Sequence, residues 1–144
     1  MKDFACCSIA TIREGLRVGE FTACEVAEQS IARIEAIDPT INAFLETTPE
    51  AALAQADRVD AAITAGNFDT LGPLAGVPVA FKDNMNQKGT HTTCASRMLE
   101  NYVSPYTATC VQQVIDAGAL PLGKLNMDEF AFGSTTESSA FGTT

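Results

Sequence analysis

Two short apolar segments, each ending at a lysine, constrain the fold of this chain most. The first runs from Val77 to Phe81, follows a Gly- and Pro-rich approach that begins at Gly72, and ends at Lys82. Gly and Pro fix the places where the backbone turns, while β-branched and aromatic residues favour a buried strand. The second segment runs from Ala119 to Gly123 and is followed at once by Lys124. We therefore predict two short strands that each deliver a lysine at the carboxyl end, where α/β proteins usually place their chemistry.

A helix predicted between these strands determines how they are related. Thr107 is the expected N-cap of a helix that continues to about Asp116, and Gly118 is the expected C′ residue. The apolar side of this helix is predicted to consist of Cys110, Val111, Val114 and Ile115. A strand–helix–strand unit is normally right-handed, with its strands parallel or nearly so. The predicted fold class is therefore α/β.

Helices dominate the chain upstream of these strands. The predicted elements are a helix from Ser8 to Val18, a helix from Thr22 to Ile37, an extended piece from Asn42 to Thr47 and a helix from Thr48 to Gly66. Ser8 is the expected N-cap of the first helix, Thr22 and Glu25 form a capping box, and Asp38-Pro39 is expected to end the second helix. We predict that residues 1–70 form a helical layer and that residues 71–144 begin the α/β core that this layer covers.

Composition narrows the class of protein. A length of 144 residues suits one domain, and a hydrophobic fraction of 46% with 19% charged residues is typical of globular proteins. The net charge of −9 argues against a nucleic-acid groove formed by this chain alone, because phosphate binding needs clustered Lys and Arg. No apolar run approaches the roughly 20 residues that span a bilayer, so no membrane association is expected.

The five cysteines are predicted to be free thiols. Their number is odd, they form no Cys-x-x-Cys pair, and His91 is the single histidine. A structural zinc site needs about four well-spaced ligands, so no metal site is predicted. Reduced thiols and the absence of a signal peptide from the first 20 residues favour a cytoplasmic location. His91 lies in a polar loop and is expected at the surface.

The residues alone leave several candidates for chemistry open. Lys82 and Lys124 occupy equivalent places in the two predicted strands, so either could be a desolvated base or an ordinary exposed cation. Asp128 and Glu129 are adjacent carboxylates, and neighbours on a helix point about 100° apart, which favours a role at a helical N-terminus over joint acid–base action. The hydroxyl-rich stretch from Ser134 to Ser139 is predicted to be a hydrogen-bonding loop, since a nucleophile would need a base nearby.

Several longer segments resemble the amidase signature family. They are Gly72-Pro73-Leu74-Ala75-Gly76-Val77-Pro78, Phe81-Lys82-Asp83-Asn84, Thr92-Thr93-Cys94-Ala95-Ser96, Gly123-Lys124-Leu125-Asn126-Met127-Asp128-Glu129-Phe130 and Gly133-Ser134-Thr135-Thr136-Glu137-Ser138. Within that family, these segments and the N-terminal helices are most similar to the A subunits of the aspartyl/glutamyl-tRNA amidotransferases. The resemblance covers essentially the whole chain and implies the first strands of an amidase-type mixed sheet.

The resemblance also implies a mechanism. The family uses a Ser–cis-Ser–Lys triad, and its lysine falls on Lys82, which would accept a proton from the nucleophilic serine through a bridging serine. Gly133 and Ser134 would contribute to substrate binding. In the A subunits the substrate is glutamine, and the ammonia passes to partner subunits B and C, which amidate Glu-tRNA(Gln) or Asp-tRNA(Asn) in a step that needs ATP and Mg²⁺. No cofactor is expected in this chain, and tRNA is expected to contact the complex rather than this chain.

One part of the family pattern does not occur in these 144 residues. The Gly/Ser-rich run that carries both triad serines is absent, so we expect an incomplete amidase domain that is inactive by itself. Two alternatives remain at this stage. The chain could derive from a general amidase that acts on another small amide, or it could be a truncated interaction module without enzymatic activity.

Overall fold

The computed structural model describes residues 3–144 and contains two compact units. The first unit consists of the chain up to Ile34 together with Thr48–Val79 and Val114–Leu122. The second consists of Glu35–Thr47, Ala80–Gln113 and Gly123–Thr144. The chain passes between the units several times, so that the helix Ala23–Ile41, for example, begins in the first unit and ends in the second.

The helices of the first unit begin where the sequence predicts. Helix α1 spans Ile9–Val18, and the hydroxyl of Ser8 accepts the N–H of Thr11 as an N-cap. Its C-cap, Gly19, has a φ of 70°, the left-handed conformation that glycine adopts without steric cost. Helix α2 spans Ala23–Ile41 and opens with the predicted capping box, in which Thr22 and Glu25 bond each other's backbone N–H.

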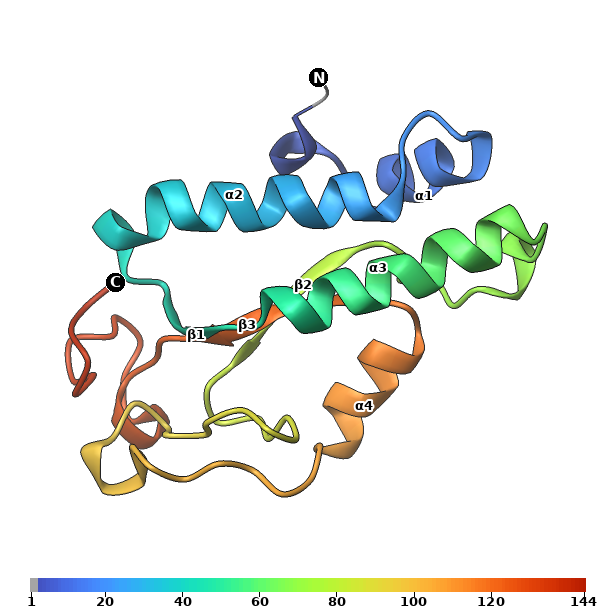
Figure 1. Ribbon diagram of the computed structural model, residues 1–144. Helices are drawn as coiled ribbons and strands as arrows, with labels where there is room; N and C mark the ends of the chain where they lie inside the picture. Colours follow the sequence, from blue (N-terminus) through green and yellow to red (C-terminus); the bar gives the residue numbers. More distant parts are fainter. Residues whose placement is uncertain (1–2) are drawn as a thin grey trace. The chain divides into compact units, whose positions relative to one another are not determined.

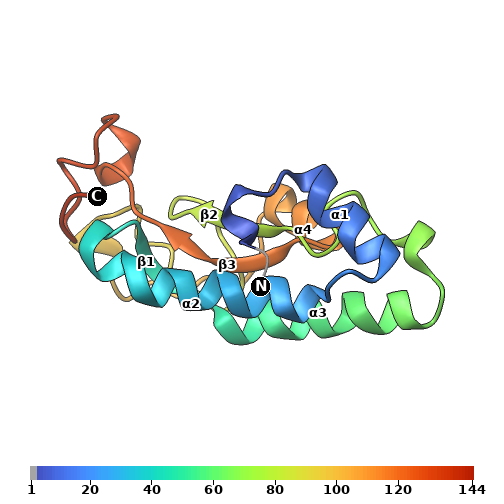
Figure 2. The ribbon, with the colours of Figure 1, turned by 90° about the horizontal axis from the view of Figure 1, so that it is seen from above.

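Helix α3, Pro49–Thr64, lies beside the start of α2 in Figures 1 and 2 and is joined to it by one carboxylate. Asp60 accepts the N–H groups of Ala23 and Cys24 at 2.7 and 3.0 Å. These are N–H groups of the first turn of a helix, which have no partner within the helix itself. The carboxylate also faces the positive end of the helix dipole. A side chain of α3 thus completes the N-terminal cap of α2.

The second helix does not end at Asp38-Pro39, as the sequence suggested, but continues to Ile41 with Pro39 inside it. The carboxylate of Asp38 accepts the N–H groups of Ala43 and Phe44, and its carbonyl accepts the N–H of Asn42. These bonds stabilise the final turn. Asn42 then leaves the helix with a φ of 57°, a conformation that asparagine tolerates well.

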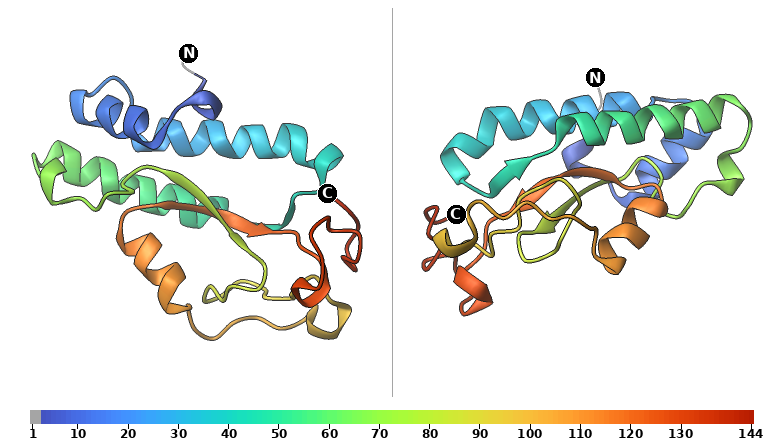
Figure 3. Two further views of the ribbon diagram at one scale, coloured as in Figure 1. Left: turned by 180° about the vertical axis from the view of Figure 1, so that it is seen from behind. Right: turned by 60° about the horizontal axis from the view of Figure 1, so that its bottom comes forward.

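Three strands form one mixed sheet in the order β1-β3-β2. They are β1, Phe44–Thr47; β2, Pro78–Lys82; and β3, Leu120–Leu125. Strand β1 pairs antiparallel to β3. Between β2 and β3, Leu120 donates to the carbonyl of Val77 and Asp83 donates to that of Leu125, so these two strands run parallel, as both views of Figure 3 show. The α/β class with a mixed sheet is therefore confirmed.

The strands end later than predicted. Lys82 is the last residue of β2, and Lys124 lies within β3 rather than after it. The reason is the edge strand: β1 places Glu46 opposite Lys124 and Thr47 opposite Gly123. This pairing extends β3 beyond the point at which its own apolar pattern stops.

Helix α4, Thr109–Asp116, departs from the sequence prediction at two positions. Thr107 does not cap it, because its hydroxyl accepts the N–H of Lys88 instead. Cys110 is exposed rather than inward, while Val111 is buried. The remaining regular pieces are short 3₁₀ turns: η1 Phe4–Cys6, η2 Phe68–Thr70, η3 Arg97–Leu99 and η4 Glu129–Ala131.

The segments that precede β2 and β3 are in direct backbone contact. Leu74 donates to the carbonyl of Ala117 and Gly76 donates to that of Gly118. Gly118 has a φ of 93°, and a Cβ atom there would lie 2.7 Å from the Cα of Ala75. Both the backbone conformation and the space therefore require glycine.

We expect Gly118→Ala to lower the free energy of unfolding by about 2–4 kcal/mol, since it adds a backbone clash to the strain of positive φ. Gly66→Ala is the matched control, because its φ of 75° is similar but no atom lies within 4 Å of the added Cβ. The control should cost about 1 kcal/mol. Urea denaturation measures both, and equal losses would show that the close approach contributes nothing.

Candidate functional site

A fully buried lysine forms the centre of the second unit. Lys124 has an exposed fraction of 0%, and its ammonium lies 2.9 Å from a carboxylate oxygen of Asp83, which is 1% exposed. The ammonium also donates to the carbonyl of His91 at 2.8 Å and to the hydroxyl of Thr92 at 3.3 Å. Three acceptors match the three N–H donors of an ammonium group. The buried charge is thus fully paired, and removing either partner of such a pair typically costs about 3–5 kcal/mol.

The second carboxylate oxygen of Asp83 is also occupied. It accepts the backbone N–H of Thr93 at 2.9 Å and the hydroxyl of Thr93. The backbone of Asp83 is held on both sides, because its N–H donates to Leu125 and its carbonyl accepts the N–H of Cys94. Asp83 therefore joins the end of β2 both to β3 and to the segment around Thr93.

The structure separates the two lysines that the sequence left equivalent. Lys82, at the carboxyl end of β2, is exposed, whereas Lys124 is buried in the ion pair. The Lys124 amine is enclosed by its three acceptors and has no exposed surface, so a reacting group has no access to it. The sequence predicts that the two strands near Asp83 and Lys124 are neighbours, since a βαβ unit joins them. It could not show that the side chains meet.

The hydroxyl-rich loop is built around Asp128. One carboxylate oxygen of Asp128 accepts the N–H groups of Thr135 and Thr136, each at 2.9 Å, and the other accepts both the N–H and the hydroxyl of Ser138. The hydroxyl of Ser138, followed by its backbone N–H and those of Thr136 and Thr135, lowers the pKa of Asp128 to about 2. The predicted hydrogen-bonding loop is confirmed, but Asp128 makes no side-chain cap to the short helix η4 that it precedes.

Gly133 is required by the same carboxylate. A Cβ atom at this position would lie 2.5 Å from the carboxyl carbon of Asp128, so the backbone passes directly against the side chain. Ser134 follows it and is exposed. The other member of the acidic pair, Glu129, accepts the hydroxyl of Ser96 at 2.5 Å. The adjacent carboxylates thus have separate partners.

The histidine and the cysteines show no sign of a catalytic role. His91 is exposed, and its Nδ1 lies 3.1 Å from Glu46. All five cysteines are free thiols. Burial, and then the carboxylate of Asp83, raises the pKa of Cys94, while burial and hydrogen bonding to Asp57 raise the pKa of Cys24 to about 12. A raised pKa keeps a thiol protonated at neutral pH, so neither is an activated nucleophile.

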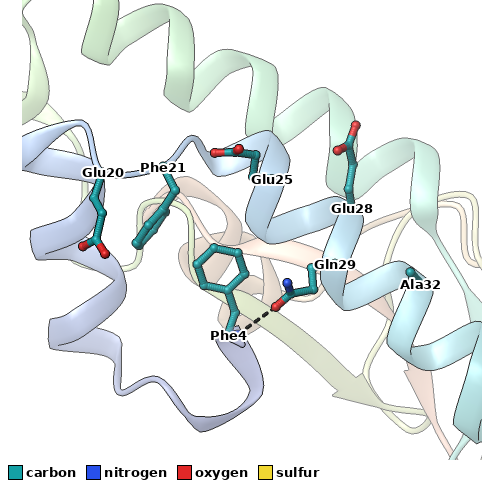
Figure 4. Close-up of a pocket in the computed structure, with 7 residues that line it drawn as sticks. All are labelled: Phe4, Glu20, Phe21, Glu25, Glu28, Gln29 and Ala32. Carbon is teal, nitrogen blue, oxygen red and sulfur yellow. Dashed lines mark hydrogen bonds between the residues drawn. The ribbon is translucent and has the colours of Figure 1, made fainter. Parts of the chain in front are cut away.

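Both units contain a pocket among the residues that the structure describes. A pocket of about 580 Å³ in the first unit (Figure 4) has aromatic walls, with Phe4 and Phe21 in an edge-to-face contact at 4.7 Å, and an acidic rim. The rim residues are Glu20, Glu25 and Glu28. A hollow of about 350 Å³ in the second unit is lined by Asp83, His91 and Thr93 among others, so it adjoins the buried ion pair. Only the second hollow contains residues of the lysine-centred cluster.

Other kinds of site find no support in the part of the chain that the structure describes. Residues 3–144 contain no group of three or more His, Cys, Asp or Glu side chains placed to hold a metal ion. Among the same residues, no helix is both long enough and apolar enough to cross a membrane.

With this geometry established, comparison with known proteins identifies the family. Residues 25–144 match the protein family described as Amidase. The chain belongs to the amidase signature family, and the segments that resemble it carry the buried pair and the Asp128 loop.

Individual relatives narrow the likeness further. The chain is 53% identical over 137 residues to the A subunit of glutamyl-tRNA(Gln) amidotransferase from Prochlorococcus marinus strain MIT 9303, a match that covers 95% of this chain and 28% of that protein. The crystal structure of the A subunit of glutamyl-tRNA(Gln) amidotransferase from Thermotoga maritima has a TM-score of 0.72 at 35% identity, covering 98% of this chain and 27% of that one. Peptide amidase from Stenotrophomonas maltophilia has a TM-score of 0.84 at 32% identity, covering 97% and 29%. The chain thus spans between a quarter and a third of the length of each relative.

The loop around Asp128 yields a prediction. Because the folded-state pKa is lowered to about 2, the charged carboxylate stabilises the loop at all pH values above its unfolded pKa near 4, and this stabilisation is lost as the pH falls through about 2. Asp128→Asn removes the charge at every pH. We expect it to lower the hydrogen-exchange protection of the Thr135, Thr136 and Ser138 amides by about tenfold at pH 6.

The matched control is Glu137→Gln, which neutralises an exposed carboxylate in the same loop. It should leave the protection of the three amides unchanged. If Asp128→Asn also leaves them unchanged, the carboxylate does not hold the loop.

Proposed function

We propose that this chain is the N-terminal part of the glutamine-hydrolysing A subunit of a tRNA-dependent amidotransferase. The observation that carries the proposal is the 53% identity, over nearly the whole chain, to the A subunit of a glutamyl-tRNA(Gln) amidotransferase. The proposed reaction is hydrolysis of the side-chain amide of glutamine, which supplies ammonia for the conversion of Glu-tRNA(Gln) or Asp-tRNA(Asn) to Gln-tRNA or Asn-tRNA.

In this proposal Lys82 is the base of a Ser–cis-Ser–Lys triad. Its amine accepts a proton from the bridging serine as that serine takes the proton of the nucleophilic serine. The nucleophile attacks the amide carbonyl, the proton returns from Lys82 through the bridging serine to the amide nitrogen, and the nitrogen leaves as ammonia. Water then hydrolyses the acyl-enzyme and releases glutamate. Lys82 suits this role because it is exposed at the carboxyl end of β2, where another part of the enzyme can reach it, whereas Lys124 is enclosed. Both serines belong to a Gly/Ser-rich run that is not among these 144 residues.

The loop held by Asp128 is proposed to contribute to the substrate site. Gly133 and Ser134 lie at its start and are exposed, while the following N–H groups are bonded to the carboxylate. A loop with a fixed backbone can hold a substrate group without ordering cost at the moment of binding. We place Gly133 and Ser134 against glutamine on this basis.

The later steps are proposed for partner subunits B and C. ATP and Mg²⁺ belong to the partner's amidation of tRNA, and the described residues offer no cluster of ligands for a metal. The net charge of −9 is consistent with tRNA contacts made by the complex rather than by this chain. Protein synthesis in the cytoplasm is the proposed setting.

A general amidase is the second candidate. The observation in its favour is the TM-score of 0.84 to a peptide amidase, which exceeds that of 0.72 to an amidotransferase subunit. Backbone likeness reports the fold that both classes share, however, and function resides in the side chains of the site. The difference between 53% and 32% identity therefore favours the amidotransferase.

The role of Lys82 can be tested directly in the full-length protein that carries this segment. Lys82→Ala should lower the kcat of glutamine hydrolysis by more than about 10³-fold, because the nucleophile loses its proton acceptor. Lys88→Ala removes another exposed lysine and should retain full activity. Activity of Lys82→Ala within tenfold of the parent would overturn the triad assignment.

The 144-residue chain by itself should show no glutaminase activity and should bind a hydrophobic dye. The expected activity loss follows from the two serines that it does not contain, and the dye binding follows from exposed apolar side chains such as Met98 and Phe132, which are 83% and 90% exposed. Dye fluorescence and a thermal melt measure this. A cooperative melt without dye binding would instead favour an independent interaction module.

A further inference from the structure

Lys82 is exposed, yet the backbone at and directly after it is held by several hydrogen bonds. The next residue, Asp83, is anchored through its N–H, its carbonyl and both oxygens of its carboxylate. The carbonyl of Lys82 itself accepts the N–H of Met85 at 2.9 Å. The direction in which the Lys82 side chain leaves the backbone is therefore determined by its neighbours.

The carboxylate of Asp83 is the part of this anchor that an apolar residue could not replace. Burying an ion pair carries a desolvation cost, and well-packed apolar residues are often at least as stabilising. Directional hydrogen bonds, by contrast, fix orientation: one oxygen of Asp83 meets Lys124 and the other meets Thr93. The arrangement is costly for stability alone and well suited to holding one backbone position.

A fixed backbone position matters for a base that accepts its proton through a bridging serine. Catalytic groups act at near-attack distances, and a displacement of about 1 Å can cost roughly 100-fold in rate. A flexible lysine side chain needs at least its Cα and Cβ to be fixed, because its own rotamers add further freedom.

We propose that the buried Asp83–Lys124 pair, with Thr93 as its brace, positions Lys82 for proton transfer. The proposal rests on the proposed function, since it assumes that Lys82 is the base. Asp83, Lys124 and Thr93 are positioning residues: they act through the backbone of Lys82 and do not themselves exchange protons with the substrate.

The test uses variants of the full-length protein that keep the shape of the buried cluster. Thr93→Val removes the hydroxyl that bonds Asp83, and Thr93→Ser restores it. Thr90→Val is the matched control, because Thr90 is buried in the same segment and its hydroxyl bonds the carbonyl of Gln87 instead. Asp83→Asn provides a stronger perturbation that is nearly isosteric. Glutamine hydrolysis kinetics and melting temperature are measured for each.

We expect Thr93→Val to lower kcat by about tenfold or more with KM within about twofold, because substrate binding is untouched while the base is displaced. Thr93→Ser should recover most of that kcat. Thr90→Val should lower the melting temperature by a similar amount and leave kcat unchanged. Asp83→Asn, where it folds, should lose more kcat than Thr93→Val.

Equal kcat for Thr93→Val and Thr90→Val would overturn the positioning role, as would a kcat loss in both that follows melting temperature alone. This failure is distinguishable from failure of the proposed function. If Lys82→Ala abolishes hydrolysis while Thr93→Val does not affect it, Lys82 is the base and the pair is only structural. If Lys82→Ala retains activity, the triad assignment itself is wrong.

Discussion

The second unit depends on the pairing of one buried ammonium. Lys124 lies within the central strand β3, and its charge is acceptable there only because Asp83, His91 and Thr92 supply three acceptors. Those acceptors come from the end of β2 and from the segment that follows it. The first part of the irregular chain between β2 and α4 is thereby tied to β3.

Other carboxylates also hold irregular parts of the chain in place, but they accept hydrogen bonds from backbone N–H groups rather than from a cation. Asp60 completes the N-terminus of α2, Asp38 completes its last turn, and Asp128 gathers the loop from Thr135 to Ser138. A carboxylate accepts several bonds at once, and bonds to a charged acceptor are stronger than neutral ones. An acidic chain can therefore use its excess of negative charge to order irregular backbone.

Local signals in the sequence were sufficient for much of the fold. The cap at Ser8, the capping box at Thr22 and the βαβ order were predicted correctly because each depends on residues close in the sequence or on hydrophobic period. Errors arose where a distant partner intervened: Thr107 bonds Lys88 instead of capping α4, and β1 extends β3 past Gly123. At the site, sequence could place Lys82 and Lys124 at strand ends, but their different burial depends on contacts with Thr92 and Asp83 that no spacing reveals.

The Asp128 carboxylate constrains the backbone of its loop more than it constrains the side chains of the loop. The carboxylate bonds mainly main-chain N–H groups, which every residue except proline possesses, so it is indifferent to most side chains at Thr135 and Thr136. Gly133 is the exception, since its lack of a side chain makes room for the carboxylate. A loop of this kind can exchange its outward side chains, Ser134 among them, while the carboxylate still holds the same main-chain N–H groups.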